Sequence, residues 1–222
     1  MSRVIAIVPL KERSQRFPGK NLAILNEKPL YESILKTLLL VEEIDEIYIY
    51  SSSTKFKVPF QGKTNKIFHK TRPSTLDGDN VSINEVLRVF LSDTDAETIV
   101  LAHATSPFIS PETISVCLNK VKTGSNDSAL AALKLHKFVV FKGNPLNFNR
   151  DQDLPPLQTI EPVVIEQGGL YVFRKSEFLA RNTRVGVNPH FAYVNLFEGI
   201  DIDTAEDFDL AKAIILAKSV DS

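Results

Sequence analysis

Two aspartates near the C-terminus are spaced so that a single divalent cation could bind both. Asp201 and Asp203 lie in the segment Gly-Ile-Asp-Ile-Asp-Thr, and residues two apart on an extended chain project to the same side. Carboxylate oxygens suit Mg²⁺, which keeps water molecules or substrate phosphates in its remaining positions. Thr204 and Asp207 also form a capping-box pattern for a following helix, but that pattern accounts for neither aspartate. We therefore expect Asp201 and Asp203 to bind Mg²⁺.

A second group of reactive side chains lies near the N-terminus, where positive charge is concentrated. Five cations stand against one acid there: Arg3, Lys11, Arg13, Arg16 and Lys20 against Glu12. Arginine and lysine make strong, charge-assisted hydrogen bonds to phosphate. The segment has neither the Gly-x4-Gly-Lys-Ser/Thr nor the Gly-x-Gly-x-x-Gly pattern. It is therefore either a solvated charged loop or a site for a small polyanion.

The elements that must position these side chains alternate between strand and helix. Apolar runs predict strands at 3–8, 46–51, 66–69, 98–102, 128–133, 163–173 and 192–196, the sixth being one long strand or a pair. Helical spacing and caps predict helices at 31–39, 81–90 and 204–217, with another beginning at Ser110-Pro111. Asp79 or Asn80 is available to cap the helix at 81–90. This order predicts a three-layer α/β fold, with a mostly parallel twisted sheet and helices on both faces.

The predicted sheet indicates where the chemistry should take place. Ligands of such sheets bind outside the carboxyl ends of the strands. We therefore expect the site in the loops after Val8, Ile49, Leu101 and Tyr171. His103 follows one of these strands directly. A single histidine is often structural, but at this position we expect it to belong to the site.

Length and composition describe one domain. The 222 residues fit a single domain over 1–222, with an irregular excursion at 137–162. A net charge of −1 argues against nucleic-acid binding, which needs a broad basic surface. No apolar stretch approaches about 18 residues and no signal peptide is recognisable, so we expect no membrane segment and a cytoplasmic location. Cys117 is the single cysteine, in a position typical of a buried helix.

The N-terminal loop resembles the CTP-binding signature of the acylneuraminate (sialic acid) cytidylyltransferases, which runs Ile-Pro-Ala-Arg-Gly-Gly-Ser-Lys-Arg-Ile-Pro-Gly-Lys-Asn. The residues that agree are Pro9, Ser14, Arg16, Pro18, Gly19, Lys20 and Asn21, and Lys11 keeps the charge of the arginine. The two adjacent glycines of the signature are Glu12 and Arg13 here. Since glycines let a backbone approach a triphosphate closely, the phosphate cradle is expected to differ in detail.

Further segments resemble the same family in the same order. Residues 72–79 are similar to Arg-Pro-x-x-Leu-Ala-x-Asp, and 199–208 match the Ile-Asp-Ile-Asp-Thr segment. Residues 101–107 are similar to Leu-Gln-Pro-Thr-Ser-Pro, with His103 in place of the glutamine.

The acceptor side departs further from the family pattern. Residues 166–172 are similar to Glu-Asn-Gly-Ala-Ile-Tyr-Ile, with Gln167 replacing the asparagine. The family's upstream Arg-Gln pair is Leu157-Gln158, so an arginine that would help hold an anionic sugar is absent.

The resemblance implies a nucleotidyltransferase of Rossmann-like fold that transfers CMP from CTP to the anomeric hydroxyl of a nonulosonic, sialic-acid-like sugar acid, releasing pyrophosphate. It implies catalytic roles for Arg16, Lys20, Asp201 and Asp203. It implies nucleotide binding by Lys11, Ser14, Arg16, Lys20, Asn21 and Arg72, and acceptor binding by His103, Gln158 and Gln167. Family members form homodimers, in which the excursion at 137–162 could contact the partner or the acceptor.

Two other functions stay open at this point. One is a nucleotidyltransferase of the same fold with another acceptor, such as pseudaminic acid, legionaminic acid or a different sugar. The other is a non-catalytic protein that binds a nucleotide or a sugar, which the departures at Glu12, Arg13, His103 and Leu157 favour. Retention of both Asp201 and Asp203 argues for the enzyme, because a binding module has less need of two metal ligands.

Overall fold

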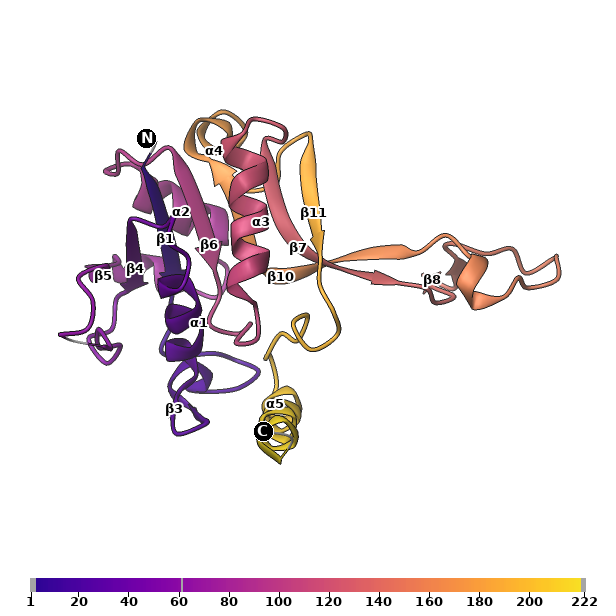
Figure 1. The fold of residues 1–222 in the computed structure, drawn as a ribbon, viewed down its shortest axis with the longest axis horizontal. Coiled ribbons are helices and arrows are strands. Elements are labelled where there is room, and N and C mark those ends of the chain that lie inside the picture. The colour runs from indigo at the N-terminus through magenta and orange to yellow at the C-terminus, as the bar shows by residue number, and fades with distance from the viewer. Residues whose placement is uncertain (1–2, 61, 221–222) are drawn as a thin grey trace.

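The computed structural model describes residues 3–60 and 62–220, and its centre is a seven-stranded sheet of order β11-β7-β10-β6-β1-β4-β5 (Figure 1). The strands are β1 (Val4–Pro9), β4 (Glu46–Ser51), β5 (Ile67–Thr71), β6 (Thr98–Ala102), β7 (Ser128–Leu135), β10 (Val163–Arg174) and β11 (Pro189–Tyr193). Four neighbours, β5, β4, β1 and β6, run parallel, as do β7 and β11, whereas β10 is antiparallel to both β6 and β7. The mostly parallel sheet is therefore confirmed.

Helices cover both faces of the sheet, which confirms the three-layer arrangement (Figure 1). They are α1 (Leu30–Leu39), α2 (Ile83–Leu91), α3 (Pro111–Lys122), α4 (Lys175–Arg181) and α5 (Ala205–Val220). Alternate residues of β1 enter different cores: Ala6 packs with residues of α1 and α3, whereas Ile7 packs with residues of α2 and α4. Burial on both sides explains why β1 is an unbroken apolar run.

Polar side chains cap the N-termini of α2, α3 and α5. Ser110 caps α3, and Thr204 with Asp207 caps α5, as their sequence patterns predicted. The cap predicted for α2 at Asp79 or Asn80 is wrong, because Ser82 forms a capping box with Glu85. That pair satisfies two helix N–H donors reciprocally. Cys117 is fully buried in α3, and burial raises the pKa of its thiol to about 12.

β10 corrects one expectation about the site. It is a single long strand whose pairing is irregular between Glu166 and Tyr171. Because it runs antiparallel to β6, the end after Tyr171 lies beside Thr98, at the edge of the sheet away from the carboxyl ends of β1 and β6. The loop after Tyr171 was therefore wrongly included, and residues before Leu170 reach the site edge instead. The sequence also did not predict α4.

Residues between β7 and β10 form an arm that projects from the body (Figure 1). It carries a short hairpin of β8 (Val140–Phe141) and β9 (Asn144–Pro145), and the short 3-10 helix η3 (Leu157–Thr159). Large apolar side chains are exposed along it, including Val140, Phe141, Leu146 and Leu154. The expected excursion at 137–162 lies in this arm. None of the helices in the described residues combines the length and the apolar character needed to cross a bilayer.

Candidate active site

Asp201 and Asp203 lie in the extended segment between β11 and α5. Ile202 between them is fully buried, and its backbone N–H donates to the Thr105 carbonyl oxygen at 2.7 Å. The two aspartates line one cavity of about 320 Å³, together with Lys20 and other residues at the carboxyl ends of β1 and β6. The buried isoleucine thus anchors a segment that presents both carboxylates to the same space.

Asp203 is held by two cations of the N-terminal loop. Its Oδ2 lies 2.7 Å from Arg16 Nη2, and its Oδ1 lies 2.9 Å from Lys20 Nζ. Lys20 also donates to the Ile202 carbonyl oxygen at 2.9 Å, and its side chain is only 12% exposed, whereas that of Arg16 is 66% exposed. The basic loop and the aspartate segment, about 180 residues apart in sequence, therefore form a single site.

Asp201 differs from Asp203 in having an oxygen without a partner. Its Oδ1 is buried and accepts no hydrogen bond, and burial raises the pKa of this carboxyl above its usual value. A buried, unpartnered carboxylate oxygen suits a hard cation. No group of three or more His, Cys, Asp or Glu side chains in the described part of the chain could hold a metal. The fit for Mg²⁺ therefore rests on two carboxylates, with substrate or water as the remaining ligands.

The loop between β1 and η1 (Lys20–Leu22) lines a second cavity of about 320 Å³. Five residues predicted to bind nucleotide border it: Lys11, Ser14, Arg16, Lys20 and Asn21. Arg16, Lys20 and Asn21 also line the aspartate cavity. The buried Asn21 donates from Nδ2 to the Lys11 carbonyl oxygen at 2.9 Å, and Gly19 takes a left-handed conformation, with φ of 71°. Because the two cavities share residues, a ligand could extend from one into the other.

Arg72, also predicted to bind nucleotide, borders neither of these cavities. Its side chain is 1% exposed, and Nη2 donates to the Leu10 carbonyl oxygen at 3.0 Å and to Asp77 Oδ1 at 2.5 Å. The guanidinium therefore stabilises the backbone at the start of the loop after β1. Contact with a phosphate would require Arg72 to leave these partners.

Glu12, which replaces a signature glycine, is turned toward the end of β4. Its carboxylate accepts from Ser53 Oγ at 2.8 Å and from Lys55 Nζ. Both hydrogen bonds hold the pKa of Glu12 below its usual value, and the bond from Lys55 has the larger effect. The negative charge that the sequence brings to the loop is thus partly neutralised by Lys55.

His103 lies at the carboxyl end of β6 and lines the aspartate cavity. Its backbone N–H continues the sheet by donating to the Gly169 carbonyl oxygen at 2.8 Å. Burial, and after it the positive charges of Arg184 and Lys20, lower the pKa of the imidazole to about 4. His103 is therefore neutral at pH 7, with one ring nitrogen able to donate and the other able to accept a hydrogen bond.

The other two residues predicted to bind the acceptor lie elsewhere. Gln167 is buried, donating from Nε2 to Ser106 Oγ at 2.8 Å and accepting the Gly169 N–H at 2.8 Å, so its amide shapes the wall of the site. Gln158 is exposed in η3 on the arm, which projects from the body (Figure 1), and it borders neither cavity described above. The structure does not bring Gln158 together with His103 in one chain.

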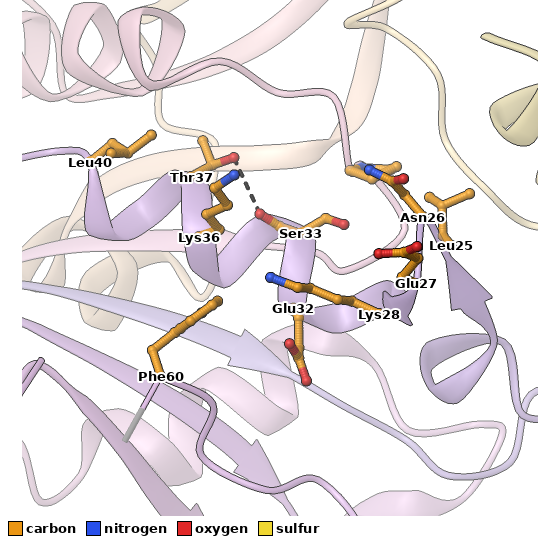
Figure 2. Close-up of a pocket in the computed structure, with 11 residues that line it drawn as sticks. Leu25, Asn26, Glu27, Lys28, Glu32, Ser33, Lys36, Thr37, Leu40 and Phe60 are labelled. Atoms are coloured by element: carbon orange, nitrogen blue, oxygen red, sulfur yellow. Dashed lines mark hydrogen bonds between the residues drawn. The ribbon is translucent and has the colours of Figure 1, made fainter. Parts of the chain in front are cut away.

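A further cavity, of about 500 Å³, lies between α1 and the hairpin of β2 (Ile24–Leu25) and β3 (Lys28–Pro29) (Figure 2). Asn26 and Glu27 at the hairpin tip both have positive φ. Lys28 extends over the ring of Phe60, at 5.6 Å from the ring centroid. Although this cavity is larger, it contains none of the residues for which the sequence predicted chemistry.

The sheet, the loop after β1 and the aspartate pair at its edge define a nucleotidyltransferase-like α/β protein. The sequence matches the cytidylyltransferase family model over residues 5–214, and the chain belongs to that family. The CMP:2-keto-3-deoxy-manno-octonic acid synthetase solved with CTP superposes with a TM-score of 0.70 at 15% identity, over 98% of this chain and 100% of the other. The 4-diphosphocytidyl-2C-methyl-D-erythritol synthase of Anaerococcus prevotii superposes with a TM-score of 0.63 at 16% identity, over 97% and 96% of the two chains.

Curated relatives share more sequence. An 8-amino-3,8-dideoxy-manno-octulosonate cytidylyltransferase of Shewanella sp. is 27% identical over 130 residues, which are 59% of this chain and 52% of the relative. The match therefore spans about half the length of that relative. The CMP-N,N'-diacetyllegionaminic acid synthase of Legionella pneumophila is 25% identical over 224 residues, covering 96% of each chain.

Proposed function

We propose that this chain transfers CMP from CTP to the anomeric hydroxyl of a nonulosonic sugar acid, releasing pyrophosphate. The observation that carries the proposal is the direct pairing of Asp203 with Arg16 and Lys20, which joins a predicted metal site to a predicted triphosphate loop. Relatives named for CMP transfer to legionaminic and octulosonic acids support the reaction class.

The roles follow from position. Lys11, Arg16 and Lys20 would neutralise the triphosphate, and the buried Asn21 would hold the loop backbone in place. Asp201 and Asp203 would hold Mg²⁺, which when bound withdraws charge from the α-phosphate. Arg16 and Lys20 are free to contact phosphate once they release Asp203. Such transfer depends on positioning and charge neutralisation rather than on a covalent enzyme intermediate.

The acceptor is proposed to be a sugar acid of the sialic-acid type, with legionaminic or pseudaminic acid as the first alternatives. His103 is neutral and borders the aspartates, so it can exchange hydrogen bonds with hydroxyl groups of an acceptor. The replacement of glutamine by His103 and of arginine by Leu157 favours a sugar substrate that differs from the substrates of the sialic-acid enzymes. We also propose that the protein acts in the cytoplasm, where CTP is available.

The decisive test is pyrophosphate release from CTP with a panel of nonulosonic and octulosonic acids, with and without Mg²⁺. We expect turnover with at least one acid, and loss of turnover after chelation of the metal. Asp201→Asn and Asp203→Asn are each expected to lower kcat by about a hundredfold or more. Asp209→Asn is the matched control, because Asp209 is 73% exposed and pairs only with Lys212 among the described residues.

A non-catalytic binding protein is the second candidate. It is favoured by Glu12 in the triphosphate loop, whose carboxylate brings negative charge near a polyanion site. CTP binding measured by calorimetry without turnover of any acid in the panel would favour that function over transfer of CMP to a sugar acid.

We further propose a homodimer in which the arm of one copy reaches the cavity of the other. The exposed apolar residues of the arm support this, because they are otherwise left in solvent. Mixing Gln158→Ala with Asp203→Asn protein tests the exchange. If Gln158 serves the other copy, heterodimers contain one intact site and activity returns to about a quarter of wild type after random reassociation. Monomers in light scattering would refute the dimer.

A further inference from the structure

Arg184 lies outside the predicted nucleotide and metal residues, yet it is held in a defined position. It comes from the loop after α4, and its guanidinium carbon stands 4.3 Å from the centroid of the Tyr171 ring. Arg184 Nη2 donates to the Tyr171 hydroxyl at 3.3 Å, and that hydroxyl donates to Glu166 Oε2 at 2.9 Å. Tyr171 is buried, so the arginine rests on a rigid aromatic surface.

This cluster lies on the same face of the sheet as the His103 side chain. Tyr171 pairs with Leu101 across β10 and β6, and both belong to the core under α2 and α4. His103 is two residues beyond Leu101, and its backbone continues the same ladder, so its side chain returns to that face. The positive charge of Arg184 contributes, after burial, to the lowered pKa of His103, so the two side chains interact electrostatically.

Among the described residues, Arg184 has no ion-pair partner and no acceptor for its Nε–H. Its Nε is buried and has no hydrogen-bond partner, and no ion pair of Arg184 occurs among the described residues. Glu166 bonds to the Tyr171 hydroxyl rather than to the guanidinium. A covered N–H without a partner costs free energy that a ligand can recover by pairing with it. The planar Nε and Nη2 edge of arginine matches the two oxygens of a carboxylate.

We propose that Arg184 binds the carboxylate of the sugar acid acceptor, with the guanidinium supported by Tyr171. The proposal rests on the proposed function, because it assigns a partner to the acidic group of that acceptor. It also supplies a cation that the sequence lacks at Leu157. Because Nε is covered and Nη2 donates to Tyr171 in this conformation, pairing with the carboxylate requires the partly buried Arg184 side chain to change rotamer while its guanidinium stays over the Tyr171 ring.

The test compares Arg184→Gln and Arg184→Lys with wild type, using an acceptor that the wild-type enzyme turns over. We expect Arg184→Gln to raise KM for the acceptor about ten- to a hundredfold, because a charge-assisted pair is lost, with KM for CTP changed less than about twofold. Arg184→Lys should recover part of the loss. Arg181→Gln is the control, because Arg181 is half exposed on α4 and pairs with Glu177.

An acceptor analogue with a carboxamide in place of the carboxylate separates charge recognition from a structural role. Wild type should discriminate against the amide, and Arg184→Gln should lose most of that discrimination. Equal discrimination by wild type and Arg184→Gln would overturn the assignment while leaving the transferase function intact. A rise in KM for CTP alone would also overturn it, since Arg184 would then bind the triphosphate. Absence of turnover with every acid in wild type would overturn the proposed function and this inference together.

Discussion

Replacing Lys20 by methionine should destabilise the protein even without any ligand. Lys20 Nζ lies 2.9 Å from Asp203 Oδ1 and 2.9 Å from the Ile202 carbonyl oxygen. At an effective dielectric constant of about 20, the attraction between unit charges at this distance is about 6 kcal/mol. Desolvation of the nearly buried ammonium cancels much of it. Because Lys20→Met leaves a partly buried carboxylate with one exposed partner, we expect the free energy of unfolding to fall by about 2 kcal/mol.

Arg16→Met is the matched comparison, since both cations pair with the same carboxylate. The Arg16 side chain is 66% exposed against 12% for Lys20, and exposed ion pairs contribute at most about 1 kcal/mol. Urea unfolding of both variants without metal or nucleotide measures the difference, provided that the m-value is unchanged. Equal destabilisation by the two substitutions would refute the reasoning, because burial would then not decide the strength of the pair.

Three further outcomes can be checked. The folded-state pKa of His103 is about 4, below its unfolded value near 6.5. The neutral imidazole therefore contributes stability that is present above pH 6.5 and is lost as the pH falls toward 4. His103→Gln should reduce the pH dependence of the unfolding free energy over that window, by no more than about 3 kcal/mol. Gly169→Ala would place a Cβ 1.8 Å from the buried Ser106 Oγ, and we expect thermal unfolding to show a loss of about 2 kcal/mol or more. Lys55→Met should raise KM for CTP, because it leaves the Glu12 carboxylate uncompensated beside the triphosphate loop, and adding Glu12→Gln should reverse that rise; a rise that persists in the double variant would contradict this.

Local patterns were sufficient to predict most of the fold. The strand at 98–102 and the helix start at Ser110-Pro111 were predicted correctly because a buried apolar run and a cap with proline act over a few residues. The direction of β10 could not be predicted in this way. Strand direction depends on partners distant in sequence, and the continuous buried run in β10 is the same in either orientation.

In the candidate site, too, local sequence patterns predicted some features and could not predict others. The two-residue spacing of Asp201 and Asp203 predicted that the two carboxylates share a side, and both line one cavity, with Ile202 buried between them. The burial of Arg72 could not be predicted, since an arginine that braces a loop and one that binds phosphate look alike in a sequence. Arg184 was also not predicted, because its support by Tyr171 comes from another element.

The pairing of Asp203 with Arg16 and Lys20 has a consequence for how ligands enter. Two formal positive charges and two formal negative charges line the aspartate cavity, and the neighbouring His103 is neutral. Such a cavity is nearly balanced, so it exerts little long-range pull on a lone cation or on a lone polyanion. We expect a nucleotide bound to a divalent cation to enter this cavity more readily than either alone, because Asp201 and Asp203 would pair with the cation while Arg16 and Lys20 would pair with the phosphates. The balance of charge in the cavity would thus select for the complex of cation and nucleotide over a free cation or a free nucleotide.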